Sequence, residues 1–425
     1  MTDPTRHLKG TERPSLEFPP EVTDAVSDII GDVRKQGDAA VHELTERFDG
    51  VRRESIRVTD DEIEAAAESL SSADKEAIDA TIENVRDFHE EQFEHIEGFE
   101  REFEEGITLG QRVLPVERAG VYIPGGRYPL VASPAMTIVP AVVAGVETVI
   151  GCAPPQDDGT VQPAQLYAMD RAGADEIYCI GGAQAIASMA YGTETVPTVD
   201  VVTGPGNIYT TEAKRQVFGH VGVDFLAGPT EVLIVADDTA DPDLVATDLL
   251  AQAEHDPESR VILVSTDETV ARETIEAVER QLEDLPTAET ARASWDDHGE
   301  VILAADDEAA AAVANDYAPE HLQVMSDDPR RYLDWLHNYG SLFLGHHSPV
   351  VFGDKAVGTN HCLPTLEVSK YTGGISVGTY LKTVTHQQLT REGADSIAAH
   401  AAKICELEGT EAHRISAERR LIDRE

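Results

Sequence analysis

The sequence predicts an α/β protein with two Rossmann-like parallel-sheet domains, a helical N-terminal region and a helical C-terminal tail. Beyond Leu109, short β-rich runs alternate with helix-length segments, which is the pattern of parallel α/β sheets. Eight such runs are expected to form two sheets, with a boundary near Ala227–Pro229. The acidic stretch before residue 105 and the stretch after Thr379 both read as helical.

The elements follow one another along the chain in a regular order. Residues 19–105 are expected to be helical, with breaks at Gly37, at Asp49-Gly50 and at Thr59–Asp61. The eight β-rich runs are 120–123, 148–152, 176–180, 199–202, 231–235, 260–264, 300–303 and 341–344. The domain division drawn from this order is an N-terminal arm (1–22), a discontinuous α/β domain (23–115 with 233–377), a second α/β domain (116–232) and a helical tail (378–425).

The chain of 425 residues is strongly acidic, with 79 Asp and Glu against 33 Lys and Arg, a formal net charge of −46. Because phosphate contacts need clusters of Lys and Arg, this balance argues against nucleic acid and anionic membranes as partners. The acids are spread along the chain, which we interpret as a surface adapted to high salt, where ions screen the self-repulsion. With 41% hydrophobic residues the chain can still bury substantial cores.

Several features favour a cytoplasmic protein. No apolar stretch approaches the roughly 20 residues that span a bilayer, and the N-terminus lacks the charged-then-apolar pattern of a secretory signal. The four cysteines are scattered without a C-x-x-C pair, so structural disulfides are not expected and a reducing compartment fits. These cysteines are Cys152, Cys179, Cys362 and Cys405.

The segment 241–257 predicts a helix with polar side chains at its end. Asp241 is a good N-cap with Pro242 at the first helical position, and Pro257 should end the helix near His255. Gln252 and His255 would then lie on one face of the last turn, where both could reach one metal ion. The alternative is an exposed helix end whose histidine complements the helix dipole.

Three further segments carry polar pairs. Glu320 and His321 follow a proline at a helix-to-strand junction and suit acid–base chemistry, although Glu-His is also a common surface dipeptide. Asp354 and His361 lie in a glycine-rich loop and suit zinc, or simply make turns. Near the C-terminus, Glu408 and His413 flank Gly409 and carry little signal alone.

Nucleotide fingerprints are missing, since neither G-x-G-x-x-G nor a phosphate-binding G-x-x-x-x-G-K-[ST] loop is present. The stretches 203–207 and 181–184 each follow a predicted strand and are rich in glycine. Such strand ends often border ligand crevices in α/β sheets, and they also often just turn.

Together the segments resemble the histidinol dehydrogenase family, in order and over nearly the whole chain. One such match is weak, whereas nine in sequence are highly specific. The matching stretches are ERAGVYIPGG (117–126), GGAQAIASMAYGTETVP (181–197), GPGN (204–207), TEAKRQV (211–217), LAGPTEVLIVAD (226–237), LLAQAEH (249–255), APEHL (318–322), GTNHCLPT (358–365) and EGTEAHR (408–414).

The resemblance implies a role for each candidate residue. The implied zinc ligands, one ion per subunit, are Gln252, His255, Asp354 and His413, and the implied catalytic pair is Glu320 and His321. The implied substrate contacts are Thr230, Gln252, His255, His321, Asp354, His361, Glu408 and His413, and the implied NAD contacts are Tyr122, Gln184 and Asn207. Thr230 departs from the Ser of many members, but it keeps the hydroxyl donor.

The resemblance also implies the reaction, the last step of histidine biosynthesis. L-Histidinol would be oxidised through L-histidinal to L-histidine, which removes four electrons and consumes two NAD. His321 would accept protons, Glu320 would activate water, and zinc would orient the substrate. The family forms homodimers in which the C-terminal tail, with Glu408 and His413, completes the partner's site. The rival hypotheses are a zinc hydrolase and a non-catalytic binding protein that has kept the fold.

Overall fold

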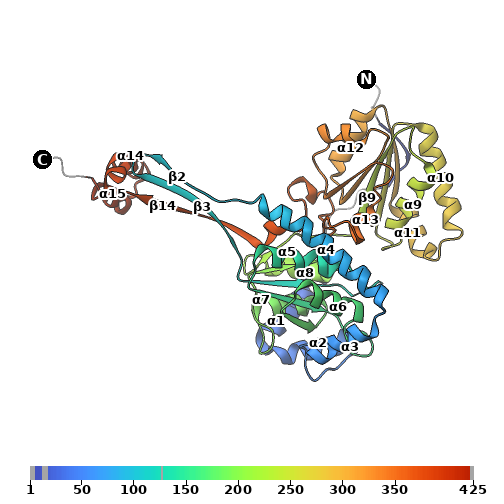
Figure 1. The fold of residues 1–425 in the computed structure, drawn as a ribbon, viewed down its shortest axis with the longest axis horizontal. Coiled ribbons are helices and arrows are strands. Elements are labelled where there is room, and N and C mark those ends of the chain that lie inside the picture. Colours follow the sequence, from blue (N-terminus) through green and yellow to red (C-terminus); the bar gives the residue numbers. More distant parts are fainter. Residues whose placement is uncertain (1–4, 12–17, 126–127, 422–425) are drawn as a thin grey trace. The chain divides into compact units, whose positions relative to one another are not determined.

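The computed structural model describes residues 5–11, 18–125 and 128–421, and these residues divide into two compact units. The larger unit comprises the described parts of 1–91 and 116–380, and the smaller comprises those of 92–115 and 381–425 (Figure 1). Parts of the expected N-terminal arm and the last four residues of the expected tail lie outside the described residues.

The first sheet of the larger unit has five parallel strands in the order β6-β5-β4-β7-β8. From the central β4 the chain runs outward through β5 and β6, then returns to β7 and β8 on the other side. This order creates a topological switch point between β4 and β7, where ligands bind in doubly wound sheets. The strands are β4 (Arg118–Tyr122), β5 (Thr148–Ala153), β6 (Glu176–Cys179), β7 (Val201–Thr203) and β8 (Gly222–Val223). The connecting helices are α5 (Ser133–Ala144), α6 (Pro163–Ala172), α7 (Gly182–Tyr191) and α8 (Ile208–Val217).

The second sheet repeats this winding and adds one antiparallel edge strand, in the order β1-β11-β10-β9-β12-β13. Its strands are β1 (Thr5–Lys9), β9 (Glu231–Ala236), β10 (Arg260–Ser265), β11 (Gly299–Ala304), β12 (His321–Met325) and β13 (Ser341–Leu344). Helices α9 (Pro242–Ala253), α10 (Glu268–Leu282) and α11 (Ala288–His298) cover one face, and α12 (Asp307–Tyr317) covers the other (Figure 1). Because both faces are covered, the central strands are continuous apolar runs, as the sequence predicted.

The N-terminal helices break where the sequence predicted, at Gly37, Gly50 and the N-cap Thr59. They are α1 (Pro20–Gln36), α2 (Asp38–Asp49), α3 (Asp60–Ser69) and α4 (Ser72–Glu94). The apolar faces of α1 and α2 lie in one hydrophobic core with α7, α8 and the five-stranded sheet. The expected division grouped residues 23–115 with 233–377, whereas α1 and α2 share their core with 116–232, because α7 and α8 offer the apolar surface that buries Val26 and Leu44.

The smaller unit corrects two expectations of helix. Its antiparallel sheet has the order β14-β3-β2, formed by β2 (Phe99–Glu104), β3 (Ile107–Pro115) and β14 (Leu381–Leu389). Residues 99–104 and 381–389 were therefore expected wrongly as helix. Neither strand is buried on either face, so neither shows the alternation that reveals a half-buried strand. The helices α14 (Arg391–Glu408) and α15 (Glu411–Glu418) complete the unit and confirm the helical end of the tail.

Two further findings concern the cysteines and the helices. All four cysteines are free thiols. Among the described helices, none combines the length and the apolar character needed to cross a bilayer.

Candidate active site

The candidate catalytic pair lies at the amino ends of β9 and β12, which are neighbouring strands of the second sheet. β12 starts at His321, whose backbone is paired with Val232 of β9, so that Glu320 and Thr230 precede neighbouring strands. Glu320 Oε2 accepts hydrogen bonds from the Thr230 hydroxyl at 2.5 Å and from the backbone N–H of Glu231 at 2.9 Å. Gln252 Nε2 donates in turn to Thr230 Oγ1 at 2.5 Å. The strand pairing thus joins three of the predicted residues in one chain of hydrogen bonds.

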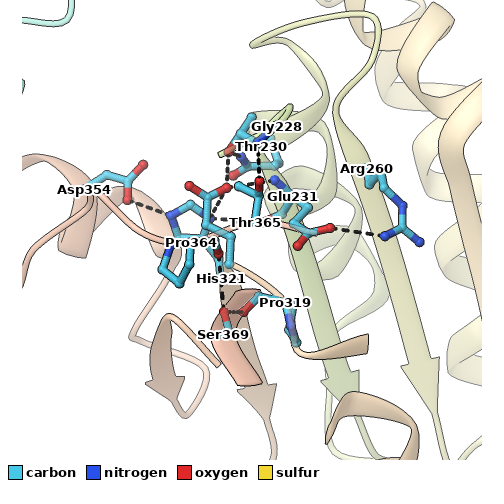
Figure 2. A network of polar contacts seen from close by, with 12 residues as sticks. Gly228, Thr230, Glu231, Arg260, Pro319, His321, Asp354, Pro364, Thr365 and Ser369 are labelled. Atoms are coloured by element: carbon cyan, nitrogen blue, oxygen red, sulfur yellow. Dashed lines mark hydrogen bonds and ion pairs between the residues drawn. The ribbon is translucent and has the colours of Figure 1, made fainter. Parts of the chain in front are cut away.

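His321 is held from both sides of its ring (Figure 2). Its Nδ1 lies 3.0 Å from the carbonyl oxygen of Glu231, so Nδ1 carries the proton and donates. Its Nε2 lies 3.2 Å from Asp354 Oδ1. Burial would lower the pKa of His321, but the carboxylates of Glu320 and Asp354 outweigh burial and raise it. Burial raises the pKa of Glu320.

A cavity of about 430 Å³ lies next to this pair, because its lining includes Gln252, which bonds to Thr230, and Asp354, which contacts His321. Other polar side chains that line it are His255, Lys355, which ends α13 (Val350–Lys355), His361, Thr81, Tyr128 and the carboxylates of Asp248 and Glu254. The rest of the wall is largely apolar and includes Ile78, Ile82, Leu130, Val131 and Val350. An apolar cavity with a few convergent polar groups is the usual form of a small-molecule site.

The histidines of this cavity are suited to bind as neutral imidazoles. Burial lowers the pKa of His255, and it lowers the pKa of His361 to about 4. His361 is fixed by two contacts, from Nδ1 to the Asp354 carbonyl oxygen at 2.6 Å and from Nε2 to Ser133 Oγ at 3.0 Å. Of the predicted loop 353–361, residues 353–355 belong to α13. His361, at the other end of this segment, is held by its hydrogen bonds to Ser133 of α5 and to the Asp354 carbonyl oxygen.

The donor set fits a divalent metal ion in part. Gln252, His255 and Asp354 line one cavity, and the amide nitrogen of Gln252 is used on Thr230, which leaves its oxygen as a donor. Asp354 already faces cationic or protonated groups, His321 at 3.2 Å and Lys355 at 3.8 Å. Within the described ranges, no group of three or more His, Cys, Asp and Glu side chains is close enough to hold a metal. The set Gln252, His255 and Asp354 contains only two side chains of those four types, so it is not excluded by that finding. A fourth ligand would have to come from another part of the protein.

Two predicted residues belong to the smaller unit. Glu408 is the last residue of α14 and His413 lies on α15, and both side chains are exposed. The larger unit therefore contributes seven of the nine predicted metal, catalytic and substrate residues, namely Thr230, Gln252, His255, Glu320, His321, Asp354 and His361.

The predicted NAD contacts lie at the carboxyl ends of strands in the five-stranded sheet. Tyr122 ends β4, and its hydroxyl accepts a hydrogen bond from the Gly182 N–H at 3.2 Å. Asn207 is the N-cap of α8, directly after β7, and its side chain is exposed apart from the capping bonds. Gln184 lies in the first turn of α7 and is buried. Tyr122 and Asn207 therefore flank the switch point between β4 and β7.

Sequence reasoning missed Glu231, Arg260 and Lys355. Glu231 contacts both catalytic residues through its backbone, and its carboxylate pairs with the buried Arg260 at 3.1 Å. The available signal was a charged residue at or next to the start of three successive apolar strands, Glu231, Arg260 and Glu300. Such residues are rarely buried unless they pair, so they indicate a buried ionic network.

Comparisons with known proteins agree with this geometry. The family model described as histidinol dehydrogenase matches residues 12–421. The chain is 48% identical over 401 residues to a histidinol dehydrogenase homolog of Shouchella clausii, covering 94% of each chain. It is 45% identical to the sulfopropanediol 3-dehydrogenase of Ruegeria pomeroyi, covering 98% of this chain and 96% of that one. The crystal structure of histidinol dehydrogenase from Elizabethkingia anophelis superposes with a TM-score of 0.91 at 37% identity, covering 96% of this chain and 94% of that chain.

Proposed function

Because the chain belongs to the histidinol dehydrogenase family, we propose that it oxidises L-histidinol through L-histidinal to L-histidine, with NAD as oxidant and zinc as cofactor. The observation that carries this proposal is the buried Glu320–His321 pair beside a cavity lined by Gln252, His255 and Asp354. An acid–base pair next to donors for one metal ion suits the oxidation of an alcohol that carries its own metal-binding nitrogens.

His321 acts as the general base. Its Nδ1 donates to the Glu231 carbonyl oxygen, and Nε2 lies 3.2 Å from Asp354 Oδ1. With Asp354 turned to zinc, Nε2 would be the nitrogen that takes the proton of the substrate hydroxyl. That proton passes to the carbonyl oxygen when water adds to the aldehyde, so the same nitrogen can take a second proton when the hydrated aldehyde is oxidised. The fixed ring keeps Nε2 directed at one point through both steps.

Glu320 activates the water that hydrates the aldehyde. Its described hydrogen bonds, from Thr230 and from the Glu231 backbone, both use Oε2, which leaves Oε1 to accept a proton from water. Burial raises the pKa of Glu320 to about 7, a value suited to taking and returning a proton near neutral pH.

Zinc would be held by Gln252, His255, Asp354 and the partner-derived His413, and when bound it orients the substrate by its nitrogens. Thr230 and His361 contribute to substrate binding. Thr230 accepts a hydrogen bond from Gln252, and His361 contacts the carbonyl oxygen of Asp354, so both lie beside proposed zinc ligands. NAD accepts hydride when bound, and Tyr122, Gln184 and Asn207 hold it at the switch point of the five-stranded sheet.

The protein works as a homodimer in the cytoplasm of a salt-adapted cell. Glu408 and His413 belong to the smaller unit and complete the site of the neighbouring subunit, with two equivalent sites across one twofold interface. The net charge of −46 supports adaptation to high salt.

One observation favours a second candidate, a dehydrogenase of the same chemistry acting on an alcohol with an anionic group. Lys355 lines the cavity 3.8 Å from Asp354, and it would lose that partner if Asp354 bound zinc, whereas histidinol has no anionic group to replace it. A relative of 45% identity is named for sulfopropanediol, whose sulfo group is an anion.

The test supplies the purified, zinc-loaded protein with NAD and, separately, L-histidinol or sulfopropanediol, and follows absorbance of NADH. The proposal predicts a kcat/KM for L-histidinol at least tenfold above that for sulfopropanediol. The reverse preference would establish the second candidate. Absence of NADH with both substrates, together with amide cleavage by the zinc-loaded protein, would establish the hydrolase instead.

A further inference from the structure

Glu231 is a buried charged residue that contacts both members of the catalytic pair. Its side chain is 1% exposed. Its backbone N–H donates to Glu320 Oε2 at 2.9 Å, and its carbonyl oxygen accepts from His321 Nδ1 at 3.0 Å. A shift of this one peptide segment would therefore move the hydrogen-bond partner of the base and that of the water-activating carboxylate together.

Both oxygens of the Glu231 carboxylate accept hydrogen bonds. Oε2 accepts from Arg260 Nη1 at 3.1 Å, and Oε1 accepts from the backbone N–H of Leu366 at 2.9 Å (Figure 2 draws the Arg260 pair). Arg260 is itself buried and donates on its other side to Glu300 Oε1 at 3.3 Å. Glu231 thus links a rigid ionic network to the loop that follows His361.

That loop needs to be held in place. Leu366 and Glu367 have positive φ angles of 53° and 68°, a region that residues with a Cβ rarely adopt and that persists only where neighbouring contacts enforce it. The contacts are the Leu366 bond to Glu231, the bond from Gly228 N–H to Thr365 Oγ1 at 2.6 Å, and packing of Leu366 against Gly228. Ser369 then donates to the carbonyl oxygen of Pro319, which directly precedes Glu320.

We propose that the Glu231 carboxylate is a positioning group for the catalytic pair, holding its own backbone between Arg260 and the 365–367 turn so that Glu320 and His321 stay aligned. Glu231 touches neither substrate nor cofactor in this role. What the pair does to the substrate rests on the proposed function, whereas its alignment by Glu231 does not.

The chain offers a matched control for the test. Glu300 is as buried as Glu231 and accepts from the same guanidinium, but its other described contacts are with the Tyr317 hydroxyl and His7 and not with the catalytic pair. Glu231→Gln and Glu300→Gln therefore remove one buried charge each beside Arg260, and both should lower the melting temperature. Only Glu231→Gln should lower kcat, by about tenfold or more, with zinc content unchanged and KM within about threefold.

Two outcomes would overturn the proposal: a kcat of Glu231→Gln within twofold of wild type, or equal losses of kcat in the two variants. If Glu231→Gln does not fold, Glu231→Asp keeps the charge but is too short to reach Arg260 and Leu366 together, and the same criteria apply to it.

A measurement without turnover separates this inference from the proposed function. The His321 Nδ1–H should give a slowly exchanging downfield proton signal in NMR spectra, identified by its loss in His321→Asn. The signal should broaden or shift in Glu231→Gln and remain in Glu300→Gln. An unchanged signal in Glu231→Gln overturns the positioning role, and absence of NADH from wild type with retained signals overturns only the proposed reaction.

Discussion

Glu320 and His321 are neighbours in the chain, but the pleat of β12 and its pairing with β9 give them different partners. Glu320 receives the Thr230 hydroxyl and a backbone N–H, whereas His321 lies between a carbonyl oxygen and Asp354. The two side chains thereby have separate hydrogen-bond partners, which is consistent with the separate roles proposed for them.

Replacing Glu320 by Gln should separate the two halves of the reaction. If Glu320 only activates water, Glu320→Gln keeps alcohol oxidation and loses most of the aldehyde oxidation, by about 10²-fold or more. Supplying L-histidinol and L-histidinal separately and measuring initial NADH rates tests this. Equal losses with both substrates would contradict the role given to Glu320.

At these positions the sequence was informative about residue type and uninformative about partners. The polar side chains of Gln252, His255 and Asp354 stand out, and the resemblance supplied their roles. Glu231 did not stand out, because its contacts depend on the pairing of β9 with β12 and on the positive φ angles at Leu366 and Glu367. Both arise only when distant segments pack together.

At the scale of the element, α9 shows how local rules direct two candidate ligands. Asp241 accepts from the Asp243 N–H, Pro242 occupies the first helical position, and the helix ends at Ala253 with Glu254 as C-cap. The sequence predicted these bounds to within two residues, because capping is local chemistry. The strands β2 and β14 were not predicted, because both are exposed on both faces. In addition, β14 pairs with β3 more than 260 residues away, although β2 is the neighbour of β3 in the chain.

The cap of α9 should contribute stability rather than catalysis. Asp241→Ala leaves a helix N–H without its acceptor and should lower the free energy of unfolding by about 1 kcal/mol. The activity at low temperature should stay within twofold of wild type, because the cap lies at the end of α9 opposite to Gln252. Asp241→Asn, which keeps a capping oxygen, is the matched control, and denaturant titration is the measurement. A kcat loss in Asp241→Ala alone would show that the cap orients the ligand-bearing end.

At the scale of the whole molecule, charge is the dominant feature. The 425-residue chain has a net charge of −46, so its acidic side chains repel one another in dilute buffer. Added salt shortens the Debye length and so weakens this repulsion. The melting temperature should therefore rise steeply between low and molar KCl. Calorimetry or circular dichroism over that range tests the expectation, and a flat profile would show that the acidic surface needs no explanation from salt.

The second property of the whole molecule is that the predicted site residues belong to two compact units, with Glu408 and His413 in the smaller one. We expect His413 to complete the metal site of the partner subunit. Asp354→Ala and His413→Ala chains, each inactive alone, should regain about a quarter of wild-type activity when unfolded and refolded together. Random pairing makes about half the dimers mixed, and each mixed dimer has one intact site. A mixture that stays inactive, while wild-type chains refold normally, would show that the tail acts within its own chain.

We expect the protein to carry out the four-electron oxidation at one site. The ratio of NADH to L-histidine tests this expectation most directly. Purified protein supplied with zinc, excess NAD and a limiting amount of L-histidinol should form two NADH for each L-histidine, measured by absorbance and by amino-acid analysis of the same reaction. The aldehyde should not accumulate, because the buried pair serves both steps without release. One NADH per histidinol with free aldehyde, or histidinol left unchanged, would contradict the account.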